Sequence, residues 1–495
     1  MRKRSLSVAV LAAAALAAVP GSAGAVTCSH PAGAYTAGNG GVGAAGGPTT
    51  GDPLAPAQWG LAQIKAPGAW ARGARGDGVT IAVLDTGADL SHPDLQGKLA
   101  GGTDYVKDGD GCAGPQDEHG HGTHVAGIAA ANTGNGVGVA GVAPGAKVMP
   151  VRVLDAGGSE PREGAVYEAI RWAADNGADV INLSLADLPL QGTLDGTGAD
   201  AEAAVSHAWS KGSVVVAAAS NESFPLCNYP AAASRAVCVA ATDSRGLPAA
   251  YSNFPNATSG AVGVRAPGGE GSPIFCEYDG DVWSTVWPGE VTDSSAGCPV
   301  KGYETFAGSS MAAPHVAGVA ALLAGRGLSN AQIVECLRTT SSNEGLADPV
   351  FGYGIVDADA AVARCAPGST PAFQPPAAGA GGDQPPPGGG PAAGEPRVTV
   401  TVKRTTRAKL AKSGRLVATV TSSGAASVKL RGVLTRGKSK STAGTRTVKL
   451  TGAGRRGATV TLSRSARNAL ARSSKYRLVL RWRAGSQTGS ATASR

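Results

Sequence analysis

The sequence is poor in aromatic residues. They make up 4% of its 495 residues, whereas hydrophobic residues as a whole make up 42%. A core built mainly from Ala, Val, Ile and Leu suits a buried parallel sheet covered by closely packed helices. The chain is longer than one ordinary domain, so we expect a large body with accessory parts.

Long hydrophobic runs are also scarce. Residues 1–4 read MRKR, an apolar run then extends to residue 19, and residues 23–25 read AGA. This order of basic, apolar and small residues is typical of a signal peptide. The apolar run has about 14 residues, fewer than the roughly 20 that a membrane-spanning helix needs. We therefore predict a signal peptide over residues 1–25, a secreted, extracellular protein, and no transmembrane segment after cleavage.

Closely spaced cysteine pairs are absent. All eight cysteines follow residue 25, no two are closer than 11 positions, and no C-x-x-C occurs, which argues against a cysteine metal site. An even number of cysteines in an exported chain predicts four disulfides. About a hundred pairings are available to eight cysteines, and proximity favours Cys227 with Cys238, Cys276 with Cys298, Cys336 with Cys365, and Cys28 with Cys112 as the remainder.

Acidic residues are missing from the end of the chain. Residues 397–495 contain 24 Lys and Arg and no Asp or Glu, which leaves 20 basic residues against all 36 acidic ones in the rest. Such a charge predicts a polyanionic partner, and anionic cell-envelope polymers are the nearest candidates. Export and the scarcity of aromatics, with only Tyr476 and Trp482 here, disfavour nucleic acid. A solubilising module without a partner is the alternative.

The same tail carries short alternating apolar runs separated by Gly-rich turns, which predict a small all-β, sandwich-like domain. These runs are residues 398–402, 416–421, 428–434, 445–450, 458–462 and 476–482. Before the tail, residues 367–396 contain nine Pro and eight Gly, and this composition predicts an extended, solvated linker.

Strand-like and helix-like stretches alternate in the body, residues 52–366. Residues 80–84, 148–154, 180–183 and 214–217 are short and apolar, as buried parallel strands are, and residues 163–176, 199–211 and 311–325 have helical length. The alternation predicts an α/β fold with a mainly parallel sheet flanked by helices, and an active site at the carboxyl ends of the strands. Residues 26–51 form a short Gly/Ala-rich N-terminal segment without strand or helix pattern.

Three segments of the body place a chemically active side chain among glycines: VLDTG at 83–87, HGHGTHVAG at 119–127 and GSSMAAPHVAG at 308–318. A hydroxyl is a poor nucleophile unless a base takes its proton, and that base needs a carboxylate to hold its tautomer. Asp85 closes an apolar strand, His121 opens an apolar helix, and Ser310 lies where a Gly-containing turn enters another helix. Three different elements can therefore bring the three side chains together.

Each of these residues also has an ordinary interpretation. A lone Asp after a strand is usually a turn former, and a lone Ser before a helix is usually an N-cap. The cluster of His119, His121 and His124 suggests zinc as a further alternative. It lacks the H-E-x-x-H spacing and the glutamate base of metal hydrolysis.

Taken together, the three segments resemble the Asp, His and Ser signatures of the subtilisin-like serine proteases, the subtilase family, in that family's chain order. The similarity extends from about residue 52 to about residue 364 and includes AQIKAP at 62–67, GVAP at 141–144 and GYG at 352–354. The resemblance implies a serine endopeptidase that needs no cofactor for catalysis. Ser310 would be its nucleophile, His121 its base, and Asp85 the carboxylate that orients the base.

The resemblance also implies roles for residues around these three. Asn221, in ASNE at 219–222, matches the family's Ala-Gly-Asn-Glu segment and would stabilise an oxyanion together with the backbone N–H of Ser310. One wall of the main substrate pocket is matched by residues 184–186, which are Ser184, Leu185 and Ala186. Ala186 and Ser220 replace the family's usual glycines, so the cleft should be narrower.

Calcium is a further implication of the resemblance. Asp52, Asp94 and Asn135 fall at positions that resemble calcium ligands of family members, and ordinary turn residues are the alternative. Polypeptides would be the substrates, in degradation or in processing. A binding protein in which the tail does the main work, with the protease fold as its carrier, is the rival class.

Overall fold

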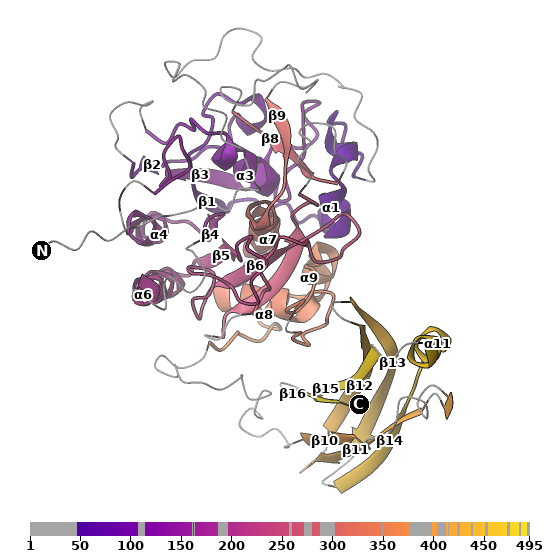
Figure 1. Ribbon diagram of the computed structural model, residues 1–495. Helices are drawn as coiled ribbons and strands as arrows, with labels where there is room; N and C mark the ends of the chain where they lie inside the picture. The colour runs from indigo at the N-terminus through magenta and orange to yellow at the C-terminus, as the bar shows by residue number, and fades with distance from the viewer. Residues whose placement is uncertain are drawn as a thin grey trace, which may run out of the picture. The chain divides into compact units, whose positions relative to one another are not determined.

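The computed structural model of the chain (Figure 1) describes residues 47–106, 114–160, 162, 164–186, 197–256, 260–271, 280–287, 302–348, 350–375, 398–402, 412–413, 415–422, 426–436, 439–450, 454–472, 476–484 and 487–492. The chain divides into two compact units, Met1–Gly381 and Gly382–Arg495, which are described in turn. The predicted signal peptide, Cys28, Cys112, Cys276 and Cys298 lie outside the described residues.

The first unit is built on a sheet of seven strands. Its order is β2 (Thr103–Asp104), β3 (Lys147–Arg152), β1 (Thr80–Asp85), β4 (Val180–Leu183), β5 (Val214–Ala218), β6 (Val237–Thr242) and β7 (Val262–Pro267). Every neighbouring pair is parallel. Strands β1, β3, β4 and β5 fall on the four apolar runs predicted as strands, so the prediction of a mainly parallel sheet is confirmed.

Helices cover both faces of this sheet (Figure 1). On one face, α3 (His121–Ala130) and α7 (Ser309–Ala324) share an apolar core with Ile81 and Val83 of β1. On the other face, α4 (Ala165–Asp175) and α6 (Thr197–Ser210) contribute to a second core with Ala82 and Leu84. Neighbouring residues of a strand point to opposite faces. Strand β1 is apolar throughout because both of its faces are covered.

Further elements of the first unit are absent from the sequence-based predictions. They are the 3-10 turns Ala55–Ala57 and Pro93–Leu95, the helices α1 (Trp59–Gln63), α2 (Ala66–Ala71), α8 (Asn330–Thr340) and α9 (Ala358–Arg364), the strands β2, β6 and β7, and the antiparallel pair of β8 (Val282–Thr285) and β9 (Tyr303–Phe306). Strands β6 and β7 are short runs rich in Ala and Val, a composition that does not distinguish a strand from a buried helix. Within the described residues, no helix has the length and hydrophobicity needed to cross a membrane.

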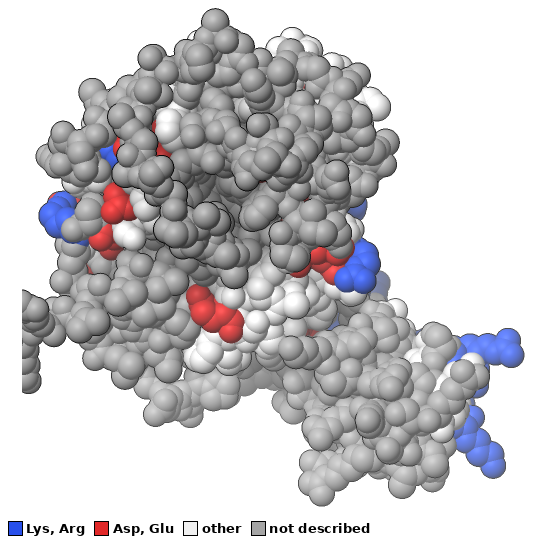
Figure 2. All heavy atoms as spheres, turned by 45° about the horizontal axis from the view of Figure 1, so that its top comes forward, with Lys and Arg blue, Asp and Glu red and all other residues white. Residues whose placement is uncertain are grey.

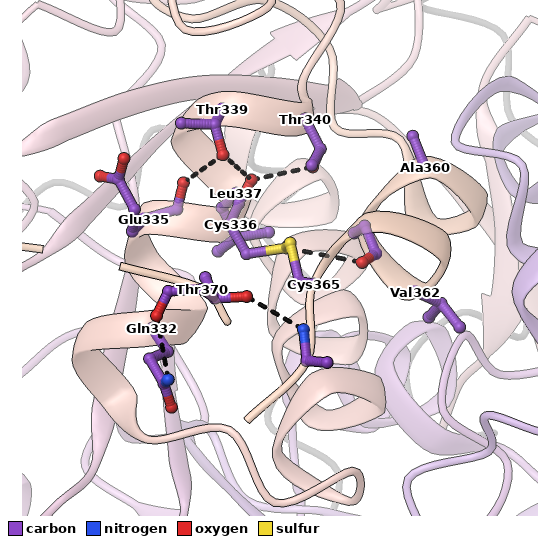
Figure 3. The surroundings of a disulfide bond; sticks show 12 residues. Gln332, Glu335, Cys336, Leu337, Thr339, Thr340, Ala360, Val362, Cys365 and Thr370 are labelled. Atoms are coloured by element: carbon purple, nitrogen blue, oxygen red, sulfur yellow. Dashed lines mark hydrogen bonds between the residues drawn. A yellow bond between two sulfur atoms is a disulfide. The ribbon is translucent and has the colours of Figure 1, made fainter. Parts of the chain in front are cut away.

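Two of the predicted disulfides are present. Cys227 and Cys238 are joined across 11 positions, and Cys336 and Cys365 across 29. The second bond ties α8 to the end of α9, as Figure 3 shows.

The first residues of the predicted linker continue this packing against the first unit. Gln332 of α8 donates to the Thr370 carbonyl at 3.0 Å, and the Phe373 N–H donates to the Ala331 carbonyl at 2.9 Å. The ring of Phe373 also contacts that of Trp209. The chain therefore remains attached to the first unit as far as Phe373.

The second unit contains two antiparallel sheets. One has the order β10 (Val398–Val402), β11 (Arg415–Ser422), β14 (Gly454–Thr461), and the other β13 (Ser439–Leu450), β12 (Ala426–Arg436), β15 (Tyr476–Ala484), β16 (Gln487–Thr492). Alternate residues such as Leu416, Ala418 and Val420 are buried, as the sandwich-like prediction requires. A helix not predicted from the sequence, α11 (Arg464–Arg472), accompanies the strands. Lys and Arg side chains project from the described surface of this unit in Figure 2, whereas Asp and Glu side chains appear on the first unit.

Candidate active site

Asp85 and His121 meet at the carboxyl end of β1. Asp85 is the last residue of that strand and is fully buried, and His121 is the first residue of α3. Nδ1 of His121 lies 2.7 Å from Oδ1 of Asp85, and the N–H of Thr86 donates to the same oxygen at 2.8 Å. The buried Oδ2 of Asp85 has no hydrogen-bond partner among the described residues. The carboxylate is therefore available to hold one imidazole tautomer.

Two glycines of the sequence motifs allow this close approach. A side chain at Gly122 would meet the carbonyl oxygen of Gly87 at 2.1 Å, and Gly87 itself has a positive φ of 108°. Neither position tolerates a Cβ without moving backbone. The glycines beside Asp85 and His121 are therefore a steric requirement of the fold.

Nearby charges control the protonation of His121. Burial alone would lower its pKa, but the charge of Asp85, the hydrogen bond to Asp85 and the charge of Asp117 together raise the pKa above the ordinary histidine value. The two other histidines of the cluster are different. Burial lowers the pKa of His119, and it lowers that of His124 to about 3. Nε2 of His124 contacts the carbonyls of Val282 and Glu304, so His124 is held away from His121.

Ser310 lies in the first turn of α7, a helix that is buried along almost its whole length and packs against β4, β5, β6 and β7. Its hydroxyl donates to the carbonyl of Ser184 at 3.0 Å, and the Ser184 hydroxyl donates to the Ser310 carbonyl at 2.7 Å. Among the described residues, no hydrogen bond joins Ser310 to His121. Hydrogen bonds of this kind are often long or poorly aligned until substrate is bound.

Asn221 and the backbone N–H of Ser310 face a common space beside Gly308. Oδ1 of Asn221 accepts the N–H of Ser309 at 2.8 Å. A Cβ built on Gly308 would lie 3.4 Å from Nδ2 of Asn221 and 3.6 Å from the N of Ser310. Both nitrogens therefore border the position that a side chain at residue 308 would occupy.

The residues predicted to bind substrate lie on both sides of this space. Ser184, Leu185 and Ala186 follow β4, and Ser220 follows the adjacent strand β5. Ser220 has a φ of 87°, a region that favours glycine. Its hydroxyl donates to Oε1 of Glu222 at 2.7 Å, and its N–H donates to the Ser309 hydroxyl at 3.1 Å. The structure thus explains why a glycine is usual at this position.

The three residues predicted as calcium ligands are also brought together. The N–H of Asn135 donates to Asp52 at 2.9 Å, and its Nδ2 donates to Asp94 at 2.8 Å. Both carboxylates are buried. Burial raises the pKa of Asp94 to about 7, and the charge of Asp52 acts in the same direction. Two buried carboxylates of like charge would favour a cation. In this structure both oxygens of Asp52 accept protein donors instead, namely the Thr50 hydroxyl and the N–H groups of residues 134–136. The described residues contain no cluster of three or more His, Cys, Asp and Glu side chains that could hold a metal ion such as zinc.

The sequence-based predictions miss one carboxylate that the structure places beside the site. Asp117 is fully buried four positions before His121 and contacts Thr86, the residue after Asp85. The only sequence signal is an acidic residue shortly before the start of a helix, a common position for helix capping.

Comparisons with known proteins agree with this architecture. The family model for the subtilase family matches residues 76–354. The chain is 43% identical to thermitase from Thermoactinomyces vulgaris over 297 residues, which cover 60% of this chain and 90% of thermitase. It is 39% identical to subtilisin Savinase from Lederbergia lenta over 306 residues, 61% of this chain and 97% of Savinase. A solved structure of a protease from Pseudoalteromonas arctica is similar with a TM-score of 0.53 and 34% identity, covering 64% of this chain and 99% of that one.

Proposed function

Since this chain belongs to the subtilase family and is a subtilisin-like serine endopeptidase, we propose that Ser310, His121 and Asp85 form its catalytic triad and that it cleaves polypeptides outside the cell. The observation that carries the proposal is the 2.7 Å contact between the buried Asp85 and His121. A carboxylate in this position holds the imidazole with Nδ1 protonated and Nε2 free to accept a proton.

Catalysis begins when the Ser310 hydroxyl turns from the Ser184 carbonyl toward His121. His121 takes the proton as Ser310 attacks the carbonyl carbon of the scissile bond, and Asp85 stabilises the resulting imidazolium. His121 then gives the proton to the leaving amine, and an acyl-enzyme remains. Water, deprotonated by His121, attacks the acyl group, and His121 returns the proton to the departing Ser310 oxygen as the second product leaves.

The oxyanion formed in both steps occupies the space beside Gly308. Nδ2 of Asn221 and the N–H of Ser310 donate to it there. The bond from the Ser309 N–H to Asn221 supports this assignment, because it fixes the orientation of the amide beside Gly308, where a Cβ would lie 3.4 Å from its nitrogen. Donors that are already oriented need no rearrangement when charge develops.

An extended substrate pairs with the backbone of residues 184–186 and passes Ser220 on the neighbouring segment. The side chains of Ala186 and Ser220 narrow this cleft relative to glycine. A peptide library with varied side chains before the cut would show the preference that results.

The proposed triad can be tested by labelling and substitution together. A fluorophosphonate reacts with an activated serine, and we expect the label on Ser310 alone when the labelled peptides are identified by mass spectrometry. The Ser310→Ala protein should take up no label and lose on the order of a millionfold in turnover. A labelled Ser309, or peptidase activity in pure Ser310→Ala protein, would reject the assignment.

Export is proposed from the signal-peptide pattern of residues 1–25. N-terminal sequencing of the protein from culture medium tests it. A mature N-terminus at or beyond Val26 supports export, and intracellular protein that starts at Met1 contradicts it.

We also propose a structural calcium ion held by Asp52, Asp94 and Asn135, completed by backbone carbonyls of the loop that contains Asn135. The burial and like charge of the two carboxylates support this proposal, and the ion would displace the Thr50 hydroxyl and the N–H groups of residues 134–136 from Asp52. A bound cation would offset their repulsion and stabilise the loop. It takes no part in the chemistry of peptide hydrolysis.

For residues 397–495 we propose a separate domain that retains the enzyme on anionic cell-envelope polymers. Strand register supports this function: Lys429 lies opposite Arg483, and Arg431 lies opposite Arg481, so like charges are paired across β12 and β15. Such pairs are unfavourable in isolation, and a polyanion would relieve them.

This retention can be measured on envelope material at increasing salt. A chain that ends after Gln374 keeps Phe373 packed on the first unit, and we expect it to cleave soluble peptides fully but to lose retention. Full-length protein should be released as salt approaches about 0.5 M, since surface charge is then screened. Salt-independent binding, or a truncated protein that cannot cleave small peptides, would contradict the proposal.

A further inference from the structure

The buried carboxylate of Asp117 is surrounded by donors from two parts of the chain. Oδ1 accepts the Thr86 hydroxyl and the N–H groups of His119 and Gly120, each at 2.9 Å. Oδ2 accepts the Thr123 N–H at 2.9 Å and the Thr123 hydroxyl at 2.5 Å. Both carboxylate oxygens therefore accept at least two hydrogen bonds, and all five bonds are buried or partly buried.

These donors belong to the segments that carry the proposed catalytic pair. Thr86 directly follows Asp85, and Thr123 lies two residues after His121 in the first turn of α3. Gly120, the residue before α3, has a positive φ and no side chain to cap the helix. Asp117 and Thr86 cap the helix instead. The N–H of Gly122 donates to the Thr86 hydroxyl at 2.9 Å, and the N–H of Thr123 donates to Asp117 at 2.9 Å.

The loop of Asp117 is also tied to the turn after β1 through its backbone. The Ala88 N–H donates to the Pro115 carbonyl at 2.9 Å, and the Asp117 N–H donates to the Ala88 carbonyl at 3.0 Å. The buried carboxylate of Asp117, which belongs to neither element, thus links the end of β1 to the start of α3.

We propose that Asp117 is a positioning residue for the hydrolytic reaction, which fixes the geometry between Asp85 and His121 through Thr86 and Thr123 and adds negative charge beside the imidazole. This inference rests on the proposed triad. It extends the catalytic machinery to a residue that touches neither substrate nor reacting atoms.

The proposed effect of the Asp117 charge depends on the other titratable groups that face His121. They are Asp85 from β1, Asp117 and His119 from the preceding loop, and His124 one turn along α3. Burial lowers the pKa of both neighbouring histidines, so near neutral pH they carry little charge. The two carboxylates then remain, and both raise the pKa of His121.

Two substitutions distinguish the effect of the Asp117 charge from that of its hydrogen bond to Thr86. Asp117→Asn removes the charge and leaves the Thr123 N–H facing an amide group. We expect kcat to fall roughly ten- to a hundredfold through misplacement of His121, with KM little changed, and the acidic limb of the kcat/KM profile to move to lower pH. Thr86→Val keeps the charge but breaks the bonds to Asp117 and Gly122. It should lower kcat without moving the acidic limb, and Thr86→Ser should restore activity.

Asp243→Asn is the matched control. Asp243 is a buried carboxylate of the same unit that accepts the N–H groups of Arg245 and Leu247 and pairs with the Arg245 guanidinium at 2.7 Å, and neither partner belongs to the proposed site. We expect this variant to keep both the rate and the pH profile. A loss of kcat in Asp243→Asn as large as in Asp117→Asn would reduce the role of Asp117 to general stability and overturn the inference.

The outcomes also distinguish this inference from the proposed triad. Wild-type protein that takes up no fluorophosphonate label on Ser310 refutes the triad itself. Labelled and active wild type, with unchanged kcat and an unmoved acidic limb in Asp117→Asn, refutes only the positioning role. If Asp117→Asn does not fold, the Thr86 pair decides: equal kcat in Thr86→Val and wild type refutes the link.

Discussion

The backbone N–H of Ser309 donates to Oδ1 of Asn221 at 2.8 Å, so the residue before the proposed nucleophile orients the amide proposed to bind the oxyanion. This bond crosses from the start of α7 to the loop that follows β5. It holds the amide through its oxygen, and a Cβ on Gly308 would lie 3.4 Å from the amide nitrogen. The orientation of Asn221 therefore does not depend on bound substrate.

The first prediction follows from that orientation. Asn221→Ala should lower kcat by roughly a hundred- to a thousandfold with little change in KM, because the lost donor acts mainly on the developing oxyanion. Steady-state kinetics on a soluble peptide measures both constants. A variant with normal kcat and a raised KM would place Asn221 in ground-state substrate binding instead.

The second prediction concerns pH. His121 accepts a proton only when neutral, and its pKa is raised by Asp85 and Asp117 against the effect of burial. The acidic limb of kcat/KM should therefore lie above the ordinary histidine value of about 6.5. Activity should rise with pH through this limb. A limb at or below the ordinary value would contradict the raised pKa, and a flat profile would contradict the assignment of His121 as the base.

The third prediction concerns the unusual backbone of Ser220. In Ser220→Gly, the relief of a positive φ and the loss of the hydrogen bond to Glu222 oppose each other, and the free energy of unfolding should stay within about 1 kcal/mol of wild type. Ser220→Ala keeps the strained backbone without the hydrogen bond and should be about 1 kcal/mol less stable than wild type. Denaturant unfolding in the Ser310→Ala background avoids self-digestion. An alanine variant more stable than the glycine variant would contradict this account.

The fourth prediction concerns the bond between Cys336 and Cys365, whose surroundings are drawn in Figure 3. It closes a loop of 29 positions between α8 and α9. Replacing both cysteines by alanine should lower the free energy of unfolding by about 3–4 kcal/mol, because the unfolded chain regains conformational freedom. The pair Cys227 and Cys238 closes a shorter loop and should cost less, about 2–3 kcal/mol. Equal stability of the wild type and the Cys336/Cys365 variant would show that this disulfide does not stabilise the fold by restricting the unfolded chain.

The fifth prediction concerns calcium. A chelator should shorten the half-life of the enzyme at elevated temperature much more than it lowers the initial rate, since the proposed ion stabilises a loop and does no chemistry. Asp94→Asn should have the same short half-life with and without chelator. Identical inactivation of wild type in both conditions would remove calcium from this account.

Short, strongly patterned segments were predictable from the sequence. The apolar runs that became β1, β4 and β5 are short, buried on both faces and bounded by polar turns, so their type follows from local composition. The motifs around Asp85, His121 and Ser310 indicated the family because their residue types, spacing and order occur together. Two disulfides followed from proximity along the chain.

Elements whose type depends on their neighbours were not predictable. Strands β6 and β7 consist mostly of small apolar residues, and only their places in the sheet, β6 between β5 and β7 and β7 at the edge, make them strands. The proposed role of Asp117 was hidden for a similar reason. An acidic residue before a helix is ordinary in sequence, and only the fold brings Thr86, 31 positions earlier, to donate to it.

The sequence by itself determined which side chains can do chemistry, because nucleophile, base and carboxylate are chemical identities that survive without a fold. The tertiary structure decided how far apart they lie and what holds them. Hydrogen bonds between residues remote in the chain exist only after the sheet and helices have packed. Three contacts illustrate this: Asp85 with His121, Ser309 with Asn221, and Thr86 with Asp117. Each is a hydrogen bond whose geometry is set by the packing of separate elements, and no local sequence pattern specifies it.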